Sequence, residues 1–116
     1  MLVCFMKFGT KETALYWESE SKDRRRWVLI VGEKLMLIMV ELDPGATVPW
    51  HSHEQEQVSF VLKGSAEVRT SEGVYIFNEG SAYNFKSNEP HETRNPGPGK
   101  LVVIEVFSPP REDLLK

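Results

Sequence analysis

The chain has 116 residues, a formal net charge of −3 and one cysteine, Cys4. Its length predicts a single domain, residues 1–116, around one core, and its mildly acidic balance argues against nucleic acid as a partner. A lone cysteine excludes an intrachain disulfide and fits a reducing compartment. No apolar run approaches membrane-spanning length, and the first residues lack the basic start and cleavage site of a signal peptide. We therefore expect a cytoplasmic protein with no membrane partner.

The first notable element along the chain is a short basic run, Asp23-Arg24-Arg25-Arg26. A run of this length is usually a solvated strand edge or loop, although one arginine could serve an acidic ligand. After this run, strand-forming segments alternate with turn signals about ten residues apart, which indicates an antiparallel sandwich or barrel. The segments rich in β-branched and aromatic residues are 27–31, 35–42, 58–62, 66–69, 74–77, 83–85 and 101–107.

Segment 35–40 is apolar on both faces. An amphipathic helix there would leave apolar groups in water, and Gly32 and Pro44 bound the segment. We expect a strand covered on both sides, by the barrel interior and by another sheet or subunit. Helix is expected only in the tail, where 110–115 could form one turn. The aromatic residues Trp50, Phe60, Tyr83 and Phe85 are expected near the mouth or in the interior of the barrel.

Two of the three histidines, His51 and His53, stand two residues apart. On a strand they would point to the same face, which is the geometry that two neighbouring metal ligands need. A bare His-x-His pair is more often a solvated turn, so the surrounding spacing decides between these readings.

That spacing resembles the two motifs of the cupin superfamily, Gly-x5-His-x-His-x3-Glu-x6-Gly and Gly-x5-Pro-x-Gly-x2-His-x3-Asn. Asn88 stands where the second motif has a glycine, and asparagine also tolerates a left-handed turn; Lys86 replaces the proline. The resemblance covers about residues 26–116. The positions in register are Gly45, His51, His53 and Gly64 in the first motif and Gly80, His91 and Asn95 in the second.

The resemblance implies an all-β, single-domain cupin barrel, a double-stranded β-helix or jelly roll. It divides the chain into N-terminal strands (1–25), barrel (26–108) and C-terminal tail (109–116). It also implies one divalent transition metal per chain (Ni, Zn, Fe, Mn, Co or Cu), and N-terminal strands that pack across a homodimer interface. The implied metal ligands are His51, His53, Gln57 and His91.

Gln57 departs from the usual cupin pattern, which has glutamate at that position. Glu56 is one residue early and would point to the opposite face of a strand. Either Gln57 binds the metal through its amide oxygen, or the site has decayed and the barrel only binds a ligand. We favour the first interpretation because all three histidines are in place. A site without an anionic protein ligand would be a strong Lewis acid and would hold its metal weakly.

The sequence around Gln57 and the segment from Glu105 to Asp113 resemble a narrower group, the KdgF-type pectin-degradation cupins. That group helps to convert ring-form 4,5-unsaturated uronates into their linear keto form. The resemblance implies functional roles for Glu105, Phe107 and Arg111. The group has aspartate where this chain has Glu105, and the extra methylene would move the carboxyl oxygens on a scale to which catalysis is sensitive.

The residues themselves are compatible with these roles. Glu105 falls on an otherwise apolar strand, so its carboxyl either lines a pocket or sits at the rim, solvated or paired with an arginine. Arg111 could clamp a carboxylate with its guanidinium or form a structural ion pair. We therefore expect Glu105 and Arg111 to be catalytic, and Phe107 and Tyr83 to touch substrate.

Three functions follow as hypotheses. The first is a metal-dependent isomerase-type or lyase-linked enzyme that opens and tautomerises a small carboxylated sugar. The second is a metal-dependent cupin dioxygenase or other oxidoreductase, for which no oxygen-specific signature is visible. The third is a non-catalytic module that binds a small ligand.

Overall fold

The computed structural model describes residues 6–116. The expectations attached to Cys4 therefore fall outside the described residues. No helix in the described part of the chain is long and apolar enough to cross a membrane. The elements are β1 (Leu15–Glu18), β2 (Arg24–Val31), β3 (Met36–Leu42), β4 (Thr47–His51), β5 (Glu56–Lys63), β6 (Ala66–Thr70), β7 (Gly73–Phe77), β8 (Ala82–Phe85), β9 (His91–Arg94), β10 (Leu101–Ser108) and the 3-10 turn η1 (Glu112–Leu115).

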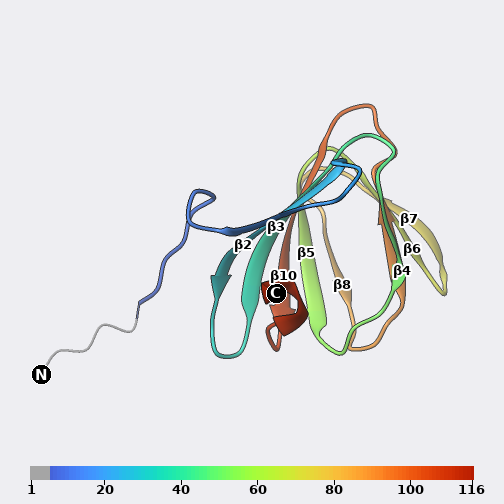
Figure 1. The fold of residues 1–116 in the computed structure, drawn as a ribbon. Helices are drawn as coiled ribbons and strands as arrows, with labels where there is room; N and C mark the ends of the chain where they lie inside the picture. Colours follow the sequence, from blue (N-terminus) through green and yellow to red (C-terminus); the bar gives the residue numbers. More distant parts are fainter. Residues whose placement is uncertain (1–5) are drawn as a thin grey trace, which may run out of the picture.

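The strands form two antiparallel sheets that face each other as the walls of a barrel (Figure 1). One sheet has the order β1-β2-β3-β10-β5-β8 and the other the order β4-β9-β6-β7. The predicted all-β jelly-roll class is confirmed, and each of the seven predicted segments overlaps a strand. Strands β4 and β9 were not predicted, because β4 contains Pro49 and β9 has no apolar alternation.

The core lies between the sheets and beneath the C-terminal turn. One buried cluster includes Leu42, Val61 and Leu101, and a second includes Ile38 and Phe107. These side chains come from inward positions that the strand register places side by side, for example Leu101 opposite Leu42. Both clusters border the histidines, since Phe85 of the first stacks on His91 and Phe107 of the second meets His53 edge-on.

Successive side chains of β5 point alternately into the barrel and out to the surface. Gln57, Ser59 and Val61 are buried, whereas Val58 and Phe60 between them are exposed. The expectation that Phe60 lies near the mouth or interior is therefore wrong. Its side chain is 41% exposed because a strand turns successive residues to opposite faces.

The outer face of the six-stranded sheet is apolar. Pairing registers align Tyr16 with Trp27, Trp27 with Met39, Met39 with Ile104, and Ile104 with Phe60. Segment 35–40 lies in a strand as predicted, with Met36 and Ile38 buried inside the barrel while the alternate residues of β3 face outward. Cover of the outer face by another sheet or subunit stays a prediction. Within residues 6–116 nothing covers this outer row fully: Tyr16 is exposed.

Tight turns support the site. Asn88 has a φ of 66°, which confirms the left-handed turn expected where the cupin motif has glycine. Its backbone N–H donates to the His53 carbonyl over 2.8 Å. Asn95 is buried, and its side-chain amide donates to the carbonyls of Leu42 and Gly99. The motif asparagine is thus a structural tie between loops.

Candidate metal centre and ligand cavity

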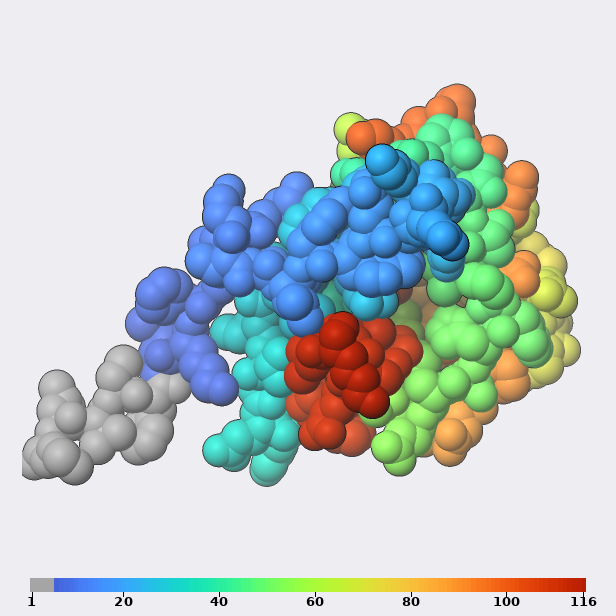
Figure 2. Space-filling model, in the orientation of Figure 1, coloured from blue at the N-terminus to red at the C-terminus, as the bar shows by residue number. Residues whose placement is uncertain are grey.

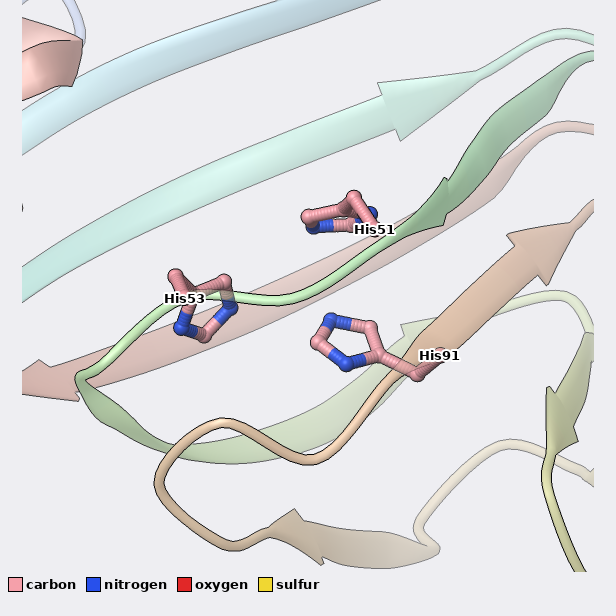
Figure 3. Close-up of side chains that lie close together, drawn as sticks. All are labelled: His51, His53 and His91. Atoms are coloured by element: carbon pink, nitrogen blue, oxygen red, sulfur yellow. The ribbon is translucent and has the colours of Figure 1, made fainter.

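Three histidines converge at one end of the barrel (Figure 3). His51 is the last residue of β4, His53 lies in the loop that follows, and His91 begins β9. The β4–β9 register places His51 opposite His91. One potential ligand atom from each ring lies within 4.8 Å of the others, a separation that one metal ion can bridge. The predicted histidine set is therefore assembled in space.

Each imidazole is oriented by a backbone carbonyl. The Nδ1 atom of His51 lies 2.7 Å from the Pro49 oxygen, that of His53 lies 2.9 Å from the Gln55 oxygen, and that of His91 lies 2.8 Å from the Glu89 oxygen. A carbonyl only accepts, so each Nδ1 carries the proton and donates, and each Nε2 keeps a free lone pair. This is how proteins orient metal-binding histidines.

Gln57 adds an oxygen to the same space. Its side-chain Nε2 donates to the Ser59 hydroxyl over 2.9 Å, which turns Oε1 toward His53 Nε2 at 3.1 Å. Gln57 is buried, whereas Glu54 and Glu56 are exposed, as expected for bystanders. The four donors fit an imidazole-rich divalent metal site, and they do not select one metal.

The surroundings of His53 and His91 favour their neutral form. Burial lowers the pKa of His91 to about 4, and burial followed by the charge of Arg111 lowers the pKa of His53. Phe85 stacks on His91 with ring centroids 3.8 Å apart. Neutral imidazoles are the form that binds metal.

The geometric reason given for the His51–His53 pair needs one correction. Strand alternation does not account for both side chains, because His53 lies beyond the end of β4. The carbonyls of Pro49 and Gln55, which hold the two rings, produce the convergence instead.

A cavity of about 280 Å³ opens beside the histidines. Its lining includes His51, Gln57, His91, Glu105 and Arg111. In Figure 2 the surface is hollowed between the blue N-terminal strands, the red C-terminal turn and the green segments. This volume lies near the lower end of small-molecule sites, roughly 300–1,000 Å³, so the cavity suits a ligand the size of a monosaccharide.

Glu105 presents an unpaired carboxyl to this cavity. Its side chain makes no hydrogen bond or ion pair with any residue in 6–116, so it lines a pocket and is not paired with an arginine at the rim. Burial raises the pKa of Glu105 to about 7, against the opposing charges of Arg111 and Arg26. A carboxyl of this kind can both accept and donate a proton near neutral pH.

Arg111 follows two prolines at the mouth of the barrel. Its guanidinium pairs with Asp113, with Nη2 2.8 Å from Oδ2, and lies over the Phe107 ring at 5.1 Å from the centroid. Arg111 is therefore a cavity residue and an ion-pair partner at the same time.

Tyr83 and Phe107 lie behind the residues that line the cavity. Phe107 is 1% exposed and meets His53 edge-on, and Tyr83 stacks against Phe77 in the core. The Tyr83 hydroxyl is buried without a well-formed hydrogen bond inside the described residues, although Ser59 and Thr93 lie close enough to affect it. Their contact with substrate stays a prediction.

Sequence reasoning overlooked one side of the cavity. Trp17, Arg24 and Arg26 also line it, whereas the basic run was interpreted mainly as a solvated edge. The available signal was alternation: on a strand, Arg24 and Arg26 share a face and Arg25 does not.

Comparison with known proteins agrees with this geometry. A cupin-domain family model matches residues 38–107, more than half of the chain. The chain is 32% identical over 100 residues to the pectin degradation protein KdgF of Dickeya dadantii (strain 3937), a match that covers 85% of this chain and 90% of that protein.

Two solved structures have the same fold over nearly their whole length. KdgF from Halomonas sp. superposes with a TM-score of 0.83 at 25% identity, covering 94% of this chain and 98% of that one. An RmlC-like cupin from Shewanella frigidimarina NCIMB 400 gives a TM-score of 0.81 at 26% identity, covering 93% and 95%. The chain therefore belongs to the cupin family and is a KdgF-like member of it.

Proposed function

We propose that this protein is a metal-dependent enzyme that converts the ring form of a 4,5-unsaturated uronate into its linear keto form. The observation that carries the proposal is the unpaired Glu105 carboxyl in the cavity wall next to the cluster of three histidines and Gln57. Similarity to KdgF, which is named for pectin degradation, supports a uronate-related sugar as the substrate class.

The proposed metal ligands are the three histidine Nε2 atoms and the Gln57 amide oxygen. A bound divalent ion would supply Lewis-acid charge at the cavity wall, undiminished by any anionic protein ligand. The chain's own contribution is orientation, since the Pro49, Gln55 and Glu89 carbonyls hold the imidazoles and Ser59 holds the amide of Gln57.

Glu105 is the proposed proton carrier. Its carboxylate takes the proton of the C1 hydroxyl, the C1–O5 bond breaks, and C1 becomes an aldehyde while O5 leaves as an enolate. The protonated Glu105 then delivers the proton to C4, so that C5 becomes a ketone and no atom is gained or lost. A pKa of about 7 suits both halves of this transfer.

Arg111 is proposed as a partner of the substrate carboxylate in the catalytic set. It lines the cavity and is positioned by Asp113 and Phe107. Phe107 and Tyr83 are proposed to touch substrate at the back of this wall, where Phe107 supports both His53 and Arg111.

The test is to incubate purified, metal-loaded protein with a 4,5-unsaturated uronate and to follow loss of its conjugated ultraviolet absorbance. We expect faster decay than without protein, and no acceleration by Glu105→Gln. Decay at the uncatalysed rate would remove this function. Binding without turnover would favour a binding module, and oxygen consumption would favour a dioxygenase.

We also propose that the protein is a homodimer and works in the cytoplasm. The apolar outer row that includes Tyr16, Trp27 and Phe60 supports a second copy as its cover. The single cysteine supports a reducing compartment.

A further inference from the structure

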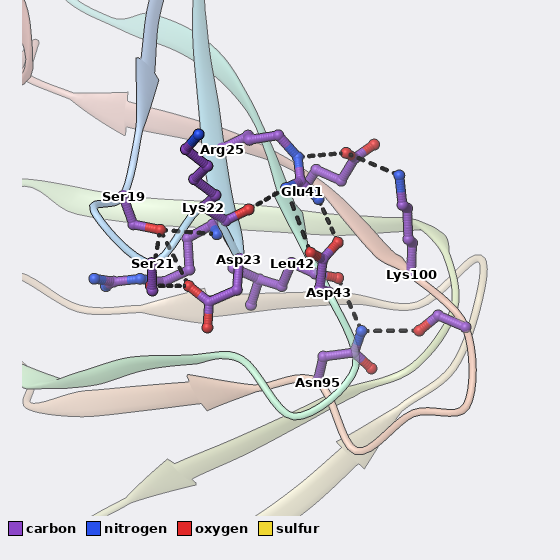
Figure 4. A network of polar contacts seen from close by, with 12 residues as sticks. Ser19, Ser21, Lys22, Asp23, Arg25, Glu41, Leu42, Asp43, Asn95 and Lys100 are labelled. Carbon is purple, nitrogen blue, oxygen red and sulfur yellow. Dashed lines mark hydrogen bonds and ion pairs between the residues drawn. The ribbon is translucent and has the colours of Figure 1, made fainter.

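Strand alternation splits the basic run into two functions. Arg25 pairs with Glu41 at 2.7 Å and also with Asp43, in the network of Figure 4. Arg24 and Arg26 lie on the opposite face of β2, in register with Leu42 and Val40, and both line the cavity. All three arginines border the cavity. Arg25 is committed to the structural network, whereas the side chains of Arg24 and Arg26 form no ion pair within residues 6–116.

Arg24 and Arg26 are the cavity cations that form no ion pair within residues 6–116, and a buried N–H donor without a partner distinguishes Arg26. Its Nε is buried without a hydrogen bond, and its guanidinium forms no ion pair within residues 6–116. Arg111, which lines the same cavity, has its charge matched by Asp113. A buried cationic donor without a partner is unfavourable in the free protein and becomes favourable when an anion arrives.

Trp17 fixes the position of Arg26. It pairs with Arg26 across the β1–β2 ladder, and its ring lies 4.6 Å from the Arg26 guanidinium carbon. The same ring lies 5.6 Å from Arg24. Stacking on an aromatic face holds a guanidinium without using its N–H donors. The N–H donors of the Arg26 guanidinium therefore remain available to bind a ligand.

The charge of the cavity contrasts with that of the whole protein. The chain has a net charge of −3, yet among the described residues Glu105 is the one acid in a lining that also contains Arg24, Arg25, Arg26 and Arg111. A cation-lined cavity in an acidic protein favours small anions over neutral sugars of the same size.

We propose that Arg26, held by Trp17, is the principal anchor for the carboxylate of the bound sugar acid. This inference rests on the proposed function, since it assumes a carboxylated ligand. Arg26 is a binding residue that decides acid against neutral sugar, Trp17 is its positioning residue, and Arg111 is the second, already neutralised cation at the mouth.

The experiment compares D-galacturonate with D-galactose by calorimetry on metal-loaded protein. These sugars differ in having a carboxylate or a hydroxymethyl group on the same ring. We expect wild type to prefer galacturonate, and Arg26→Gln to bind it about 10- to 100-fold more weakly with unchanged metal content. Arg26→Lys should recover part of the lost galacturonate affinity, because lysine restores the positive charge but cannot bind a carboxylate through two parallel N–H donors. Arg94→Gln, on an exposed arginine paired with Glu67, is the matched control.

Steady-state kinetics distinguish a role of Arg26 in substrate binding from a role in the chemical step. With a 4,5-unsaturated uronate we expect Arg26→Gln to raise KM by a similar factor and to change kcat by less than about threefold, the pattern of lost uniform binding. Trp17→Ala should raise KM too, and Trp17→Phe should restore most of it because an aromatic face returns.

The outcomes are distinguishable. Galacturonate binding without turnover in wild type removes the proposed reaction and leaves the Arg26 anchor standing. Normal turnover with an unchanged KM in Arg26→Gln overturns the anchor and leaves the reaction standing. Wild-type protein that neither binds galacturonate nor turns over the uronate overturns both, and equally tight binding of inorganic phosphate in place of galacturonate overturns carboxylate selectivity.

Discussion

The Nε2 atom of His53 lies 3.1 Å from the Oε1 atom of Gln57. Because His53 donates its Nδ1–H to the Gln55 carbonyl and Gln57 donates its amide N–H to Ser59, neither facing atom has a proton to offer. Two lone pairs aimed at one point repel each other unless a cation lies between them. This pair therefore favours a metal-binding Gln57 over a decayed site.

Gln57→Glu should tighten metal binding and slow the reaction. A carboxylate adds a unit charge next to a divalent ion, worth several kcal/mol at an effective dielectric constant of about 20, so we expect a dissociation constant at least about tenfold lower. The same charge weakens the Lewis acid, and turnover should fall by roughly tenfold or more. Chelator competition measures the first effect and uronate turnover the second.

His51→Ala should remove the metal without unfolding the barrel. His51 is half-buried, so its truncation leaves little void. We expect metal affinity to fall by more than about 100-fold, since losing only a supporting partner already costs 10- to 100-fold. Elemental analysis of untagged protein measures bound metal per chain. Glu54→Gln, on an exposed neighbour, should keep its metal; equal loss in both variants contradicts the ligand assignment.

The resemblance to the two cupin motifs implied the ligand set, and it could be seen because each motif is a local spacing in the sequence. The separations of His51, His53 and Gln57 can be read from the sequence without knowing how the barrel strands pair. The left-handed turns at Gly45 and Asn88 follow from residue type. Strands β4 and β9 escaped prediction because they are short and their pairing, not their composition, makes them strands.

The Arg26 side of the cavity could not be predicted for a related reason. Which face of β2 points inward depends on its pairing with β3, where the partners of Arg24 and Arg26 are Leu42 and Val40, more than ten residues along the chain. Composition alone makes Arg24, Arg25 and Arg26 equivalent. Phe60 was misplaced for the same reason, since its neighbour Val61 takes the inward position.

Glu105 should make stability fall as pH rises. Its pKa of about 7 in the fold exceeds the ordinary 4.5, so the folded state keeps a proton that the unfolded chain releases between those values. The free energy of unfolding should therefore drop by about 3 kcal/mol from pH 4.5 to above 7, relative to Glu105→Gln. Urea unfolding of both proteins with a chelator present measures this; a pH-independent difference contradicts it.

Phe60→Glu should dissociate the proposed dimer. Phe60 is 41% exposed on the apolar outer row of the six-stranded sheet, and a buried unpaired carboxylate there opposes association. Light scattering after size exclusion should give twice the chain mass for wild type and the chain mass for the variant. Tyr75→Glu, on a 43% exposed aromatic of the other sheet, should stay dimeric. A monomeric wild type refutes the dimer.

Arg25→Gln should lower stability and leave ligand binding intact. The Arg25 side chain is 14% exposed and joins Glu41, Asp43 and the Lys22 carbonyl, and hydrogen bonding to Asp43 raises the pKa of its guanidinium. Removing it leaves Asp43 without an ion-pair partner within residues 6–116 and leaves Glu41 only its longer contact with Lys100, at 3.7 Å.

We expect Arg25→Gln to lose about 1–3 kcal/mol in urea unfolding, whereas Arg24→Gln should change stability by less than about 0.5 kcal/mol. Galacturonate affinity should be unchanged in Arg25→Gln and reduced in Arg26→Gln. Adjacent arginines would then separate into one that stabilises the sheet and one that holds the ligand, as the alternation of β2 requires. Equal stability of the Arg24 and Arg25 variants would contradict that division.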